Sequence, residues 1–153
     1  MNNPDEIKKL AYERSEEAGI LCDNEKYDGA FYLAGYAIEL MLKAKICENF
    51  GVNNLFDESE TTKSISFVRG KIKTHDIAVL LIFSGLKNKL QDDKASNNVL
   101  DKTMTRLFHD AGHCLWSEQI RYQRNFQKPE NVIELILLLK DDKEGLLQWI
   151  EKN

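Results

Sequence analysis

Hydrophobic residues recur at the helical spacing of about 3.6 residues along most of this chain. Start and stop signals divide the pattern into five predicted helices. Pro4 and Pro129 each begin an amphipathic segment, and Gly51 and Gly85 stand where a segment ends or kinks. We expect helices over residues 4–21, from the Asp23–Asn24 break to about 50, 74–85, from the 96–98 cap to about 116, and 130–152.

The second predicted helix differs from the others because it is apolar on two opposite faces. Phe31, Ile38 and Leu42 belong to one apolar stripe, and Leu33 and Leu40 to the other. A helix with two apolar faces is buried among neighbours. We therefore expect a central helix, and an all-α fold: an antiparallel up-and-down bundle of four to five helices in a single domain spanning residues 1–153.

Residues 52–73 show no clear helical period and are rich in Asn, Ser, Thr and charge. We expect a long connection there, of the kind that is often functional or mobile. Residues 64–67 alternate briefly, so the alternative of a short strand stays open.

Composition and charge narrow the classes of function. The chain has 153 residues, 42% of them hydrophobic and 30% charged, which is typical of a globular domain. The net charge of −4 excludes a broad basic surface for unselective nucleic-acid binding. We expect a soluble cytoplasmic protein without a membrane segment, because the N-terminus lacks a signal-peptide pattern and the apolar runs at 79–83 and 132–139 are short.

No pattern in the chain indicates a metal or a cofactor. The three cysteines, Cys22, Cys47 and Cys114, are far apart and form no CxxC pair, so buried free thiols are expected. The sequence contains no phosphate-binding glycine loop, no HExxH and no nucleophile elbow. We predict no metal site and no cofactor.

Two groups of polar residues are candidates for binding. Tyr32, Tyr36, Glu39 and Lys43 share the polar arc of the central helix. They either line a nucleotide or RNA pocket or include a structural Glu39–Lys43 ion pair, for which the spacing of four is favourable.

The second group, Arg121, Tyr122 and Arg124, makes the most basic turn of the chain. It could stack a base and pair with phosphate. The alternative is that Arg121 turns inward to neutralise Glu39.

The segment AFYLAGYAIELMLKA at residues 30–44 resembles the signature of the HEPN family. The resemblance continues in Thr74-His75-Asp76-Ile77 and from Trp116 to Arg121-Tyr122, and so covers nearly the whole chain. It implies a small helical bundle, usually dimeric, that handles RNA or nucleotides. Many relatives act in toxin–antitoxin or defence systems, often beside a nucleotidyltransferase.

Active HEPN proteins are metal-independent ribonucleases that use an arginine and a histidine four to six residues apart. Arg106 and His113 fit this spacing, with His109 between them, and on a continuous helix the three would share one narrow arc. Leu107 departs from the family pattern, because active relatives usually have a polar residue directly after the arginine. Gly112 also weakens the helix.

These observations lead to three hypotheses. The favoured one is a non-catalytic HEPN-like module that binds RNA or nucleotide, acts as a homodimer and can pair with a nucleotidyltransferase. The second is an active ribonuclease toxin that uses Arg106 and His113. The third is a helical scaffold for protein–protein interaction. The sequence does not decide whether the chain is an enzyme, and the departures at Leu107 and Gly112 favour a chain that is not.

Overall fold

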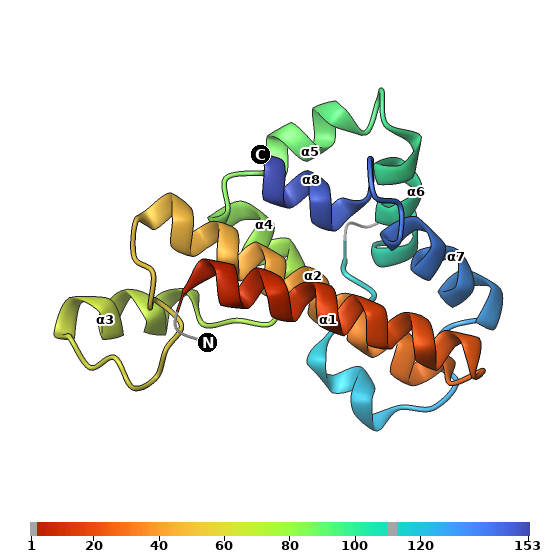
Figure 1. Cartoon of the computed structure of the whole chain (residues 1–153), viewed down its shortest axis with the longest axis horizontal. Helices are drawn as coiled ribbons and strands as arrows, with labels where there is room; N and C mark the ends of the chain where they lie inside the picture. Colours follow the sequence, from red (N-terminus) through yellow and green to blue (C-terminus); the bar gives the residue numbers. More distant parts are fainter. Residues whose placement is uncertain (1–2, 110–112) are drawn as a thin grey trace.

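The computed structural model describes residues 3–109 and 113–153, and these form an all-helical fold without an extended sheet (Figure 1). Its elements, in chain order, are α1 (Pro4–Asp23), α2 (Tyr27–Phe50), α3 (Lys63–Ile72), α4 (Ile77–Phe83), α5 (Lys87–Asp93), α6 (Asn98–Leu107), the 3₁₀ helix η1 (Glu118–Tyr122), α7 (Pro129–Leu139) and α8 (Leu146–Lys152). The all-α prediction is confirmed. No helix in the described ranges is both long and apolar enough to cross a bilayer.

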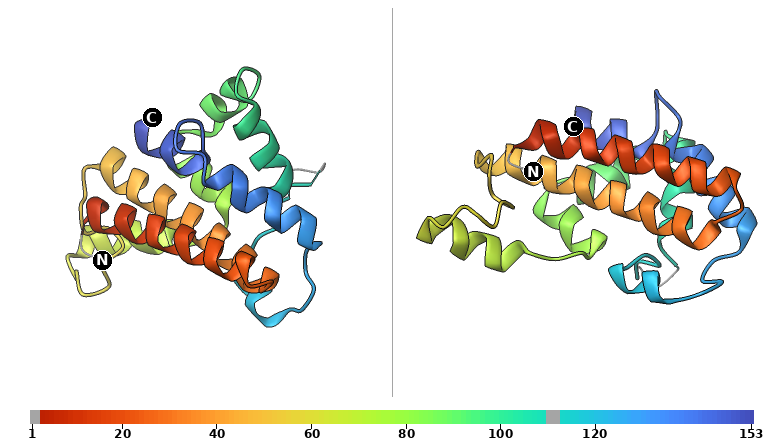
Figure 2. Two further views of the ribbon diagram at one scale, coloured as in Figure 1. Left: turned by 45° about the vertical axis from the view of Figure 1, so that its right-hand side comes forward. Right: turned by 60° about the horizontal axis from the view of Figure 1, so that its bottom comes forward.

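The first helix begins and the second ends where the sequence predicted, but the break between them lies later: α1 continues to Asp23, and Lys26 stands at the N-cap of α2. The Asn3 side chain accepts a hydrogen bond from the Glu6 amide, which caps the start of α1 ahead of Pro4. Gly51 ends α2 in the left-handed conformation, with φ of 66°. The two helices lie side by side and antiparallel (Figure 2).

Helix α2 is the centre of the fold, as its two apolar stripes predicted. Phe31 and Leu40, one from each stripe, are 3% and 1% exposed. Around α2 pack α1, α4, α7, α8 and η1. Burial on two sides therefore results from neighbours that approach from several directions.

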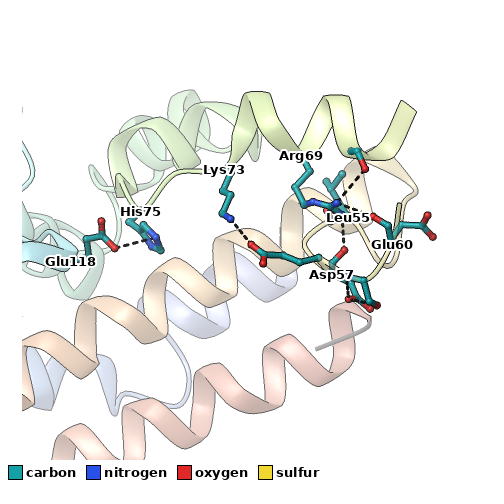
Figure 3. Close-up of polar contacts among 10 residues, drawn as sticks. Leu55, Asp57, Glu60, Arg69, Lys73, His75 and Glu118 are labelled. Atoms are coloured by element: carbon teal, nitrogen blue, oxygen red, sulfur yellow. Dashed lines mark hydrogen bonds and ion pairs between the residues drawn. The ribbon is translucent and has the colours of Figure 1, made fainter. Parts of the chain in front are cut away.

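The connection at 52–73 contains a helix, which contradicts the prediction of a long irregular segment or short strand. Ile65, Val68 and Ile72 recur at helical spacing and turn toward the core on α3. The Arg69 guanidinium donates to the carbonyls of Leu55, Asp57 and Glu60 in the preceding loop (Figure 3). One side chain thus binds three carbonyls of the loop, and the Asp57 carbonyl also accepts from the Glu60 amide.

The helix predicted over residues 74–85 is shorter than expected, and a separate helix follows it. Asp76, and not Thr74, caps α4 by accepting from the Ala78 and Val79 amides. Helix α4 ends at Phe83, before Gly85 with φ of 74°, and a further helix, α5, follows. Gly85 therefore ends the helix as expected, and α5 was missed.

The last predicted helix is two helices. Asp141 Oδ1 accepts from the amides of Lys143 and Glu144 and holds a turn between α7 and α8. A Cβ on Gly145 would lie 2.3 Å from the Asp141 carbonyl oxygen, so the turn requires glycine. The polar run at 140–145 therefore forms a turn, and the predicted single helix is divided there.

The fourth predicted helix is shorter than expected. Helix α6 ends at Leu107, and Phe108 is extended and forms an antiparallel bridge with Cys114. The prediction of a helix reaching about residue 116 is therefore wrong. The Ala111 and Gly112 positions of that prediction lie outside the described residues.

Candidate functional site

A buried carboxylate lies in the middle of α2. Glu39 is 1% exposed, and its Oε1 accepts from Lys43 Nζ at 2.6 Å. The same oxygen is 2.9 Å from His75 Nδ1. Burying a carboxylate costs free energy unless countercharge or hydrogen-bond donors surround it, and Lys43 and His75 supply these contacts to Glu39. The Lys43 ammonium also lies over the Phe56 ring, 5.4 Å from its centroid.

The predicted Glu39–Lys43 ion pair is thus present, and the alternative partner for Glu39 is wrong. Arg121 does not turn inward to it, because Lys43 and His75 occupy its Oε1 and Arg121 stays at the surface. The second oxygen, Oε2, is buried and has no hydrogen-bond partner among the described residues. Burial and the negative charge of Glu39 raise the pKa of neighbouring Tyr36.

His75 joins two elements through its two ring nitrogens. Nδ1 faces Glu39 on α2, and Nε2 is 3.1 Å from Glu118 Oε2 on η1 (Figure 3). A neutral imidazole has one N–H, so only the doubly protonated ring donates to both carboxylates. The sequence placed His75 at a helix start as a structural residue, and no sequence signal pointed to Glu118.

A buried indole aligns the tyrosines of α2. Trp116 is 2% exposed, and its Nε1 donates to the Tyr32 carbonyl at 2.9 Å. The Trp116 and Tyr32 rings stack with centroids 6.0 Å apart, and Tyr36 continues the stack at 6.3 Å from Tyr32. A Cβ on Gly35 would lie 2.1 Å from Trp116 Cδ1, so only glycine at this position leaves room for the indole.

The basic turn on η1 presents an aromatic ring to solvent. Tyr122 is 72% exposed, and the Arg121 guanidinium lies 4.9 Å from its ring centroid. The phenol groups of Tyr122, chiefly, and Tyr32 raise the pKa of Arg121. Tyr32 and Arg121 are therefore neighbours, and we call Tyr32, Tyr36, Arg121 and Tyr122 the aromatic platform. Arg124 is exposed beyond it.

The three candidate catalytic residues do not share a helical arc, because α6 ends at Leu107. Arg106 turns to α7, where Nη1 donates to Asn131 Oδ1 at 2.6 Å and Nε is 3.4 Å from Glu134 Oε2. His109 and His113 do come together, with ring centroids 5.1 Å apart. The Phe108–Cys114 bridge produces this pairing.

Carboxylates and thiols elsewhere in the described residues form no further candidate site. Asp93 accepts from the Trp149 indole at 2.8 Å. Cys22 and Cys47 are buried free thiols as expected, and Cys114 is half-buried. Within residues 3–109 and 113–153, no group of three His, Cys, Asp or Glu side chains could hold a metal ion.

Comparison of the chain with protein-family models, with curated proteins and with solved structures finds no match. What the chain binds is therefore inferred from its own side chains. The aromatic platform is the strongest candidate, because Tyr32 links the half-buried stack to Arg121, whose guanidinium lies beside the exposed Tyr122 ring. The contacts of His75 with Glu39 and Glu118 connect η1, which carries Arg121 and Tyr122, to α2, which carries Tyr32 and Tyr36.

Proposed function

We propose that this chain is a non-catalytic binding module of the HEPN type that binds single-stranded RNA or a nucleotide through the aromatic platform. The observation that carries the proposal is the Arg121–Tyr122 pair, in which an exposed ring lies under a guanidinium. A nucleotide presents a flat base and an anionic phosphate, and these two groups match a ring and a guanidinium.

The charge of the chain sets the kind of binding expected. With a net charge of −4, attraction to phosphate comes from the local arginines Arg121 and Arg124. Few phosphate contacts release few counterions, so the affinity should fall only shallowly with salt. Stacking on Tyr122, whose ring is 72% exposed, should supply the larger share of the binding free energy.

The proposal is tested by fluorescence anisotropy with a short labelled single-stranded RNA, and with AMP as competitor. Base stacking on an aromatic side chain contributes about 1–3 kcal/mol, so Tyr122→Ala should raise Kd roughly 5- to 150-fold. Tyr122→Phe keeps the ring and should bind within about twofold of the wild type. Effective competition by AMP would identify a mononucleotide as sufficient.

A matched charge control separates the platform from general electrostatics. Arg121→Gln should weaken binding, whereas Lys152→Gln removes one exposed positive charge at the end of α8 and should not. Equal affinities of the wild type and Tyr122→Ala would contradict the proposal. Absence of any RNA or nucleotide binding would favour the scaffold hypothesis.

The resemblance to HEPN proteins supports further parts of the proposal. It implies a bundle that works as a homodimer in the cytoplasm, in a toxin–antitoxin or defence setting, with a nucleotidyltransferase as a candidate partner. Light scattering at a concentration on the order of tens of micromolar tests the dimer. A monomer there would remove this part while leaving the platform intact.

An active ribonuclease is the second candidate. The close His109 and His113 rings favour it, because two imidazoles can serve as acid and base. The contacts of Arg106 with Asn131 and Glu134 disfavour it, since they occupy the guanidinium that would stabilise phosphate charge. Growth inhibition by the expressed chain that His113→Ala relieves would establish the enzyme, and no inhibition would reject it.

A further inference from the structure

Besides the aromatic platform, the surface of the molecule has a groove where α4, α5 and α6 meet. Its volume is about 540 Å³, and its walls include Leu81, Ile82, Leu90, Met104 and Phe108. Ile82 is 57% exposed, although its branched apolar side chain would be more stable out of water. None of the residues that line the groove belongs to the aromatic platform, and Figure 1 shows α5 at the top of the view and η1 at the bottom.

Charge is distributed unevenly around the groove. Lys87 and Lys94 stand on the α5 side, seven residues and therefore about 10 Å apart along one face. Neither lysine forms an ion pair within the described part of the chain, whereas Lys89 on the same helix pairs with Asp93. On the α6 side stands Asp101. One wall is thus cationic and the opposite wall anionic, in a protein whose net charge is negative.

We propose that this groove binds an amphipathic helix of a partner protein, with acidic residues on the flank that faces α5. Apolar side chains of such a helix, at spacing i, i+3, i+4 and i+7, would cover Ile82, Met104 and Phe108. Acidic residues seven apart on its flank would pair with Lys87 and Lys94. Asp101 would repel acidic residues on the flank that faces α6. The charges of the groove therefore determine which flank of the bound helix faces α5 and which faces α6.

The wall elements exclude an extended peptide that pairs as a strand. The groove is lined by three helices, whose backbone groups are bonded internally, and by Phe108 and His109 just after α6. The amides of Phe108 and His109 already donate to the carbonyls of Met104 and His113, so neither can pair with an added strand. A nucleic acid would be attracted by the two lysines but would leave the apolar floor uncovered. An amphipathic helix matches both the floor and the charged wall.

The test uses two synthetic helical peptides with the same leucine seam. One carries glutamates seven residues apart on one flank, and the other carries lysines at those positions. We expect the glutamate peptide to bind by fluorescence anisotropy and the lysine peptide to bind at least about tenfold more weakly. Equal binding of both, or binding of neither, overturns the proposal.

Charge reversal of the groove gives a second, sharper outcome. The variant Lys87→Glu with Lys94→Glu should exchange the preference and bind the lysine peptide. The control variant, Lys102→Glu with Lys152→Glu, changes net charge equally at exposed positions outside the groove and should keep the wild-type preference. A reversed-charge variant that still prefers the glutamate peptide overturns the proposal.

Contact with the apolar floor is tested by Ile82→Gln, which should weaken binding of the glutamate peptide about tenfold, since Ile82 is its most exposed apolar residue. An unchanged circular dichroism spectrum verifies that the variant is folded. Displacement of the peptide by single-stranded RNA, or a homodimer that Ile82→Gln disrupts, would assign the groove to RNA or to a second copy and overturn the proposal.

Discussion

Gly35 allows a sharp test of how tightly the centre of this molecule is packed. In a helix interior, glycine-to-alanine substitution normally stabilises by about 1 kcal/mol. At Gly35 the new Cβ would lie 2.1 Å from Cδ1 of the buried Trp116 ring. The indole cannot simply swing aside, because its Nε1 donates to the Tyr32 carbonyl.

The expected cost of Gly35→Ala outweighs the gain in helix propensity. Overpacking a core costs about 1–3 kcal/mol, and loss of the indole hydrogen bond adds about 1 kcal/mol. We therefore expect a net destabilisation of about 1–3 kcal/mol. Urea unfolding followed by far-UV circular dichroism should show a lower midpoint with an unchanged slope.

Gly70→Ala is the matched control, because nothing lies within 4 Å of a Cβ placed there on α3. It should be neutral or stabilise the chain by up to about 1 kcal/mol. In a Trp116→Ala background, Gly35→Ala should also become stabilising, since no side-chain atom beyond Cβ then remains at position 116 to meet the new methyl group. A Gly35→Ala variant as stable as the wild type would refute the inferred close packing.

Three further predictions concern charge and burial. Lys43→Met should destabilise the chain by about 2–4 kcal/mol in urea unfolding, because buried Glu39 loses a countercharge. Burial opposes ionisation of Glu48, yet hydrogen bonds from two lysines lower its pKa in the folded chain below the unfolded value of 4.5. The carboxylate therefore stabilises the fold above pH 4.5, and this contribution is lost as the pH falls through the lower, folded pKa. Glu48→Gln should flatten this dependence of stability on acid. Burial raises the pKa of Cys47 and Cys114 to about 11, so both should react with Ellman's reagent far more slowly in the native chain than in urea.

The first of these predictions has a control variant, and each of the other two has an outcome that would contradict it. Lys152→Met removes an exposed lysine and should leave stability within about 0.5 kcal/mol of the wild type. Equal acid sensitivity of the wild type and Glu48→Gln would contradict the assigned linkage. Native thiols that react as fast as unfolded ones would contradict the buried positions of the cysteines.

The sequence predicted the parts of the fold that local patterns determine. Asn3, Pro4 and Gly51 carry their own cap and stop chemistry, and the two apolar stripes of α2 require burial on two sides. The end of α6 was harder to predict, because apolar residues keep the helical spacing beyond Leu107, at 108, 111 and 115. The turn between α7 and α8 depends on Asp141 and on a close approach at Gly145; the polar run at 140–145 was a signal for this turn that the prediction of one helix passed over.

Only part of the candidate site could be predicted for a similar reason. Glu39 and Lys43 are four residues apart on one helix, so their pairing follows from helix geometry alone. The contacts of His75 with Glu118 and of Trp116 with Gly35 join residues far apart in the chain. Gly35 in the middle of an otherwise strong helix was the one visible signal, although it did not identify an indole as the neighbour.

Helix α3 and the loop before it are attached to the molecule very differently from α2. The Arg69 guanidinium binds carbonyls of its own loop, and α3 extends from one end of the molecule with only sparse contacts to other described helices (Figures 1 and 2). This segment can therefore unfold locally while the rest stays native. Its amide protons should exchange with solvent at a low opening free energy, whereas those of α2 should exchange only when the whole chain unfolds.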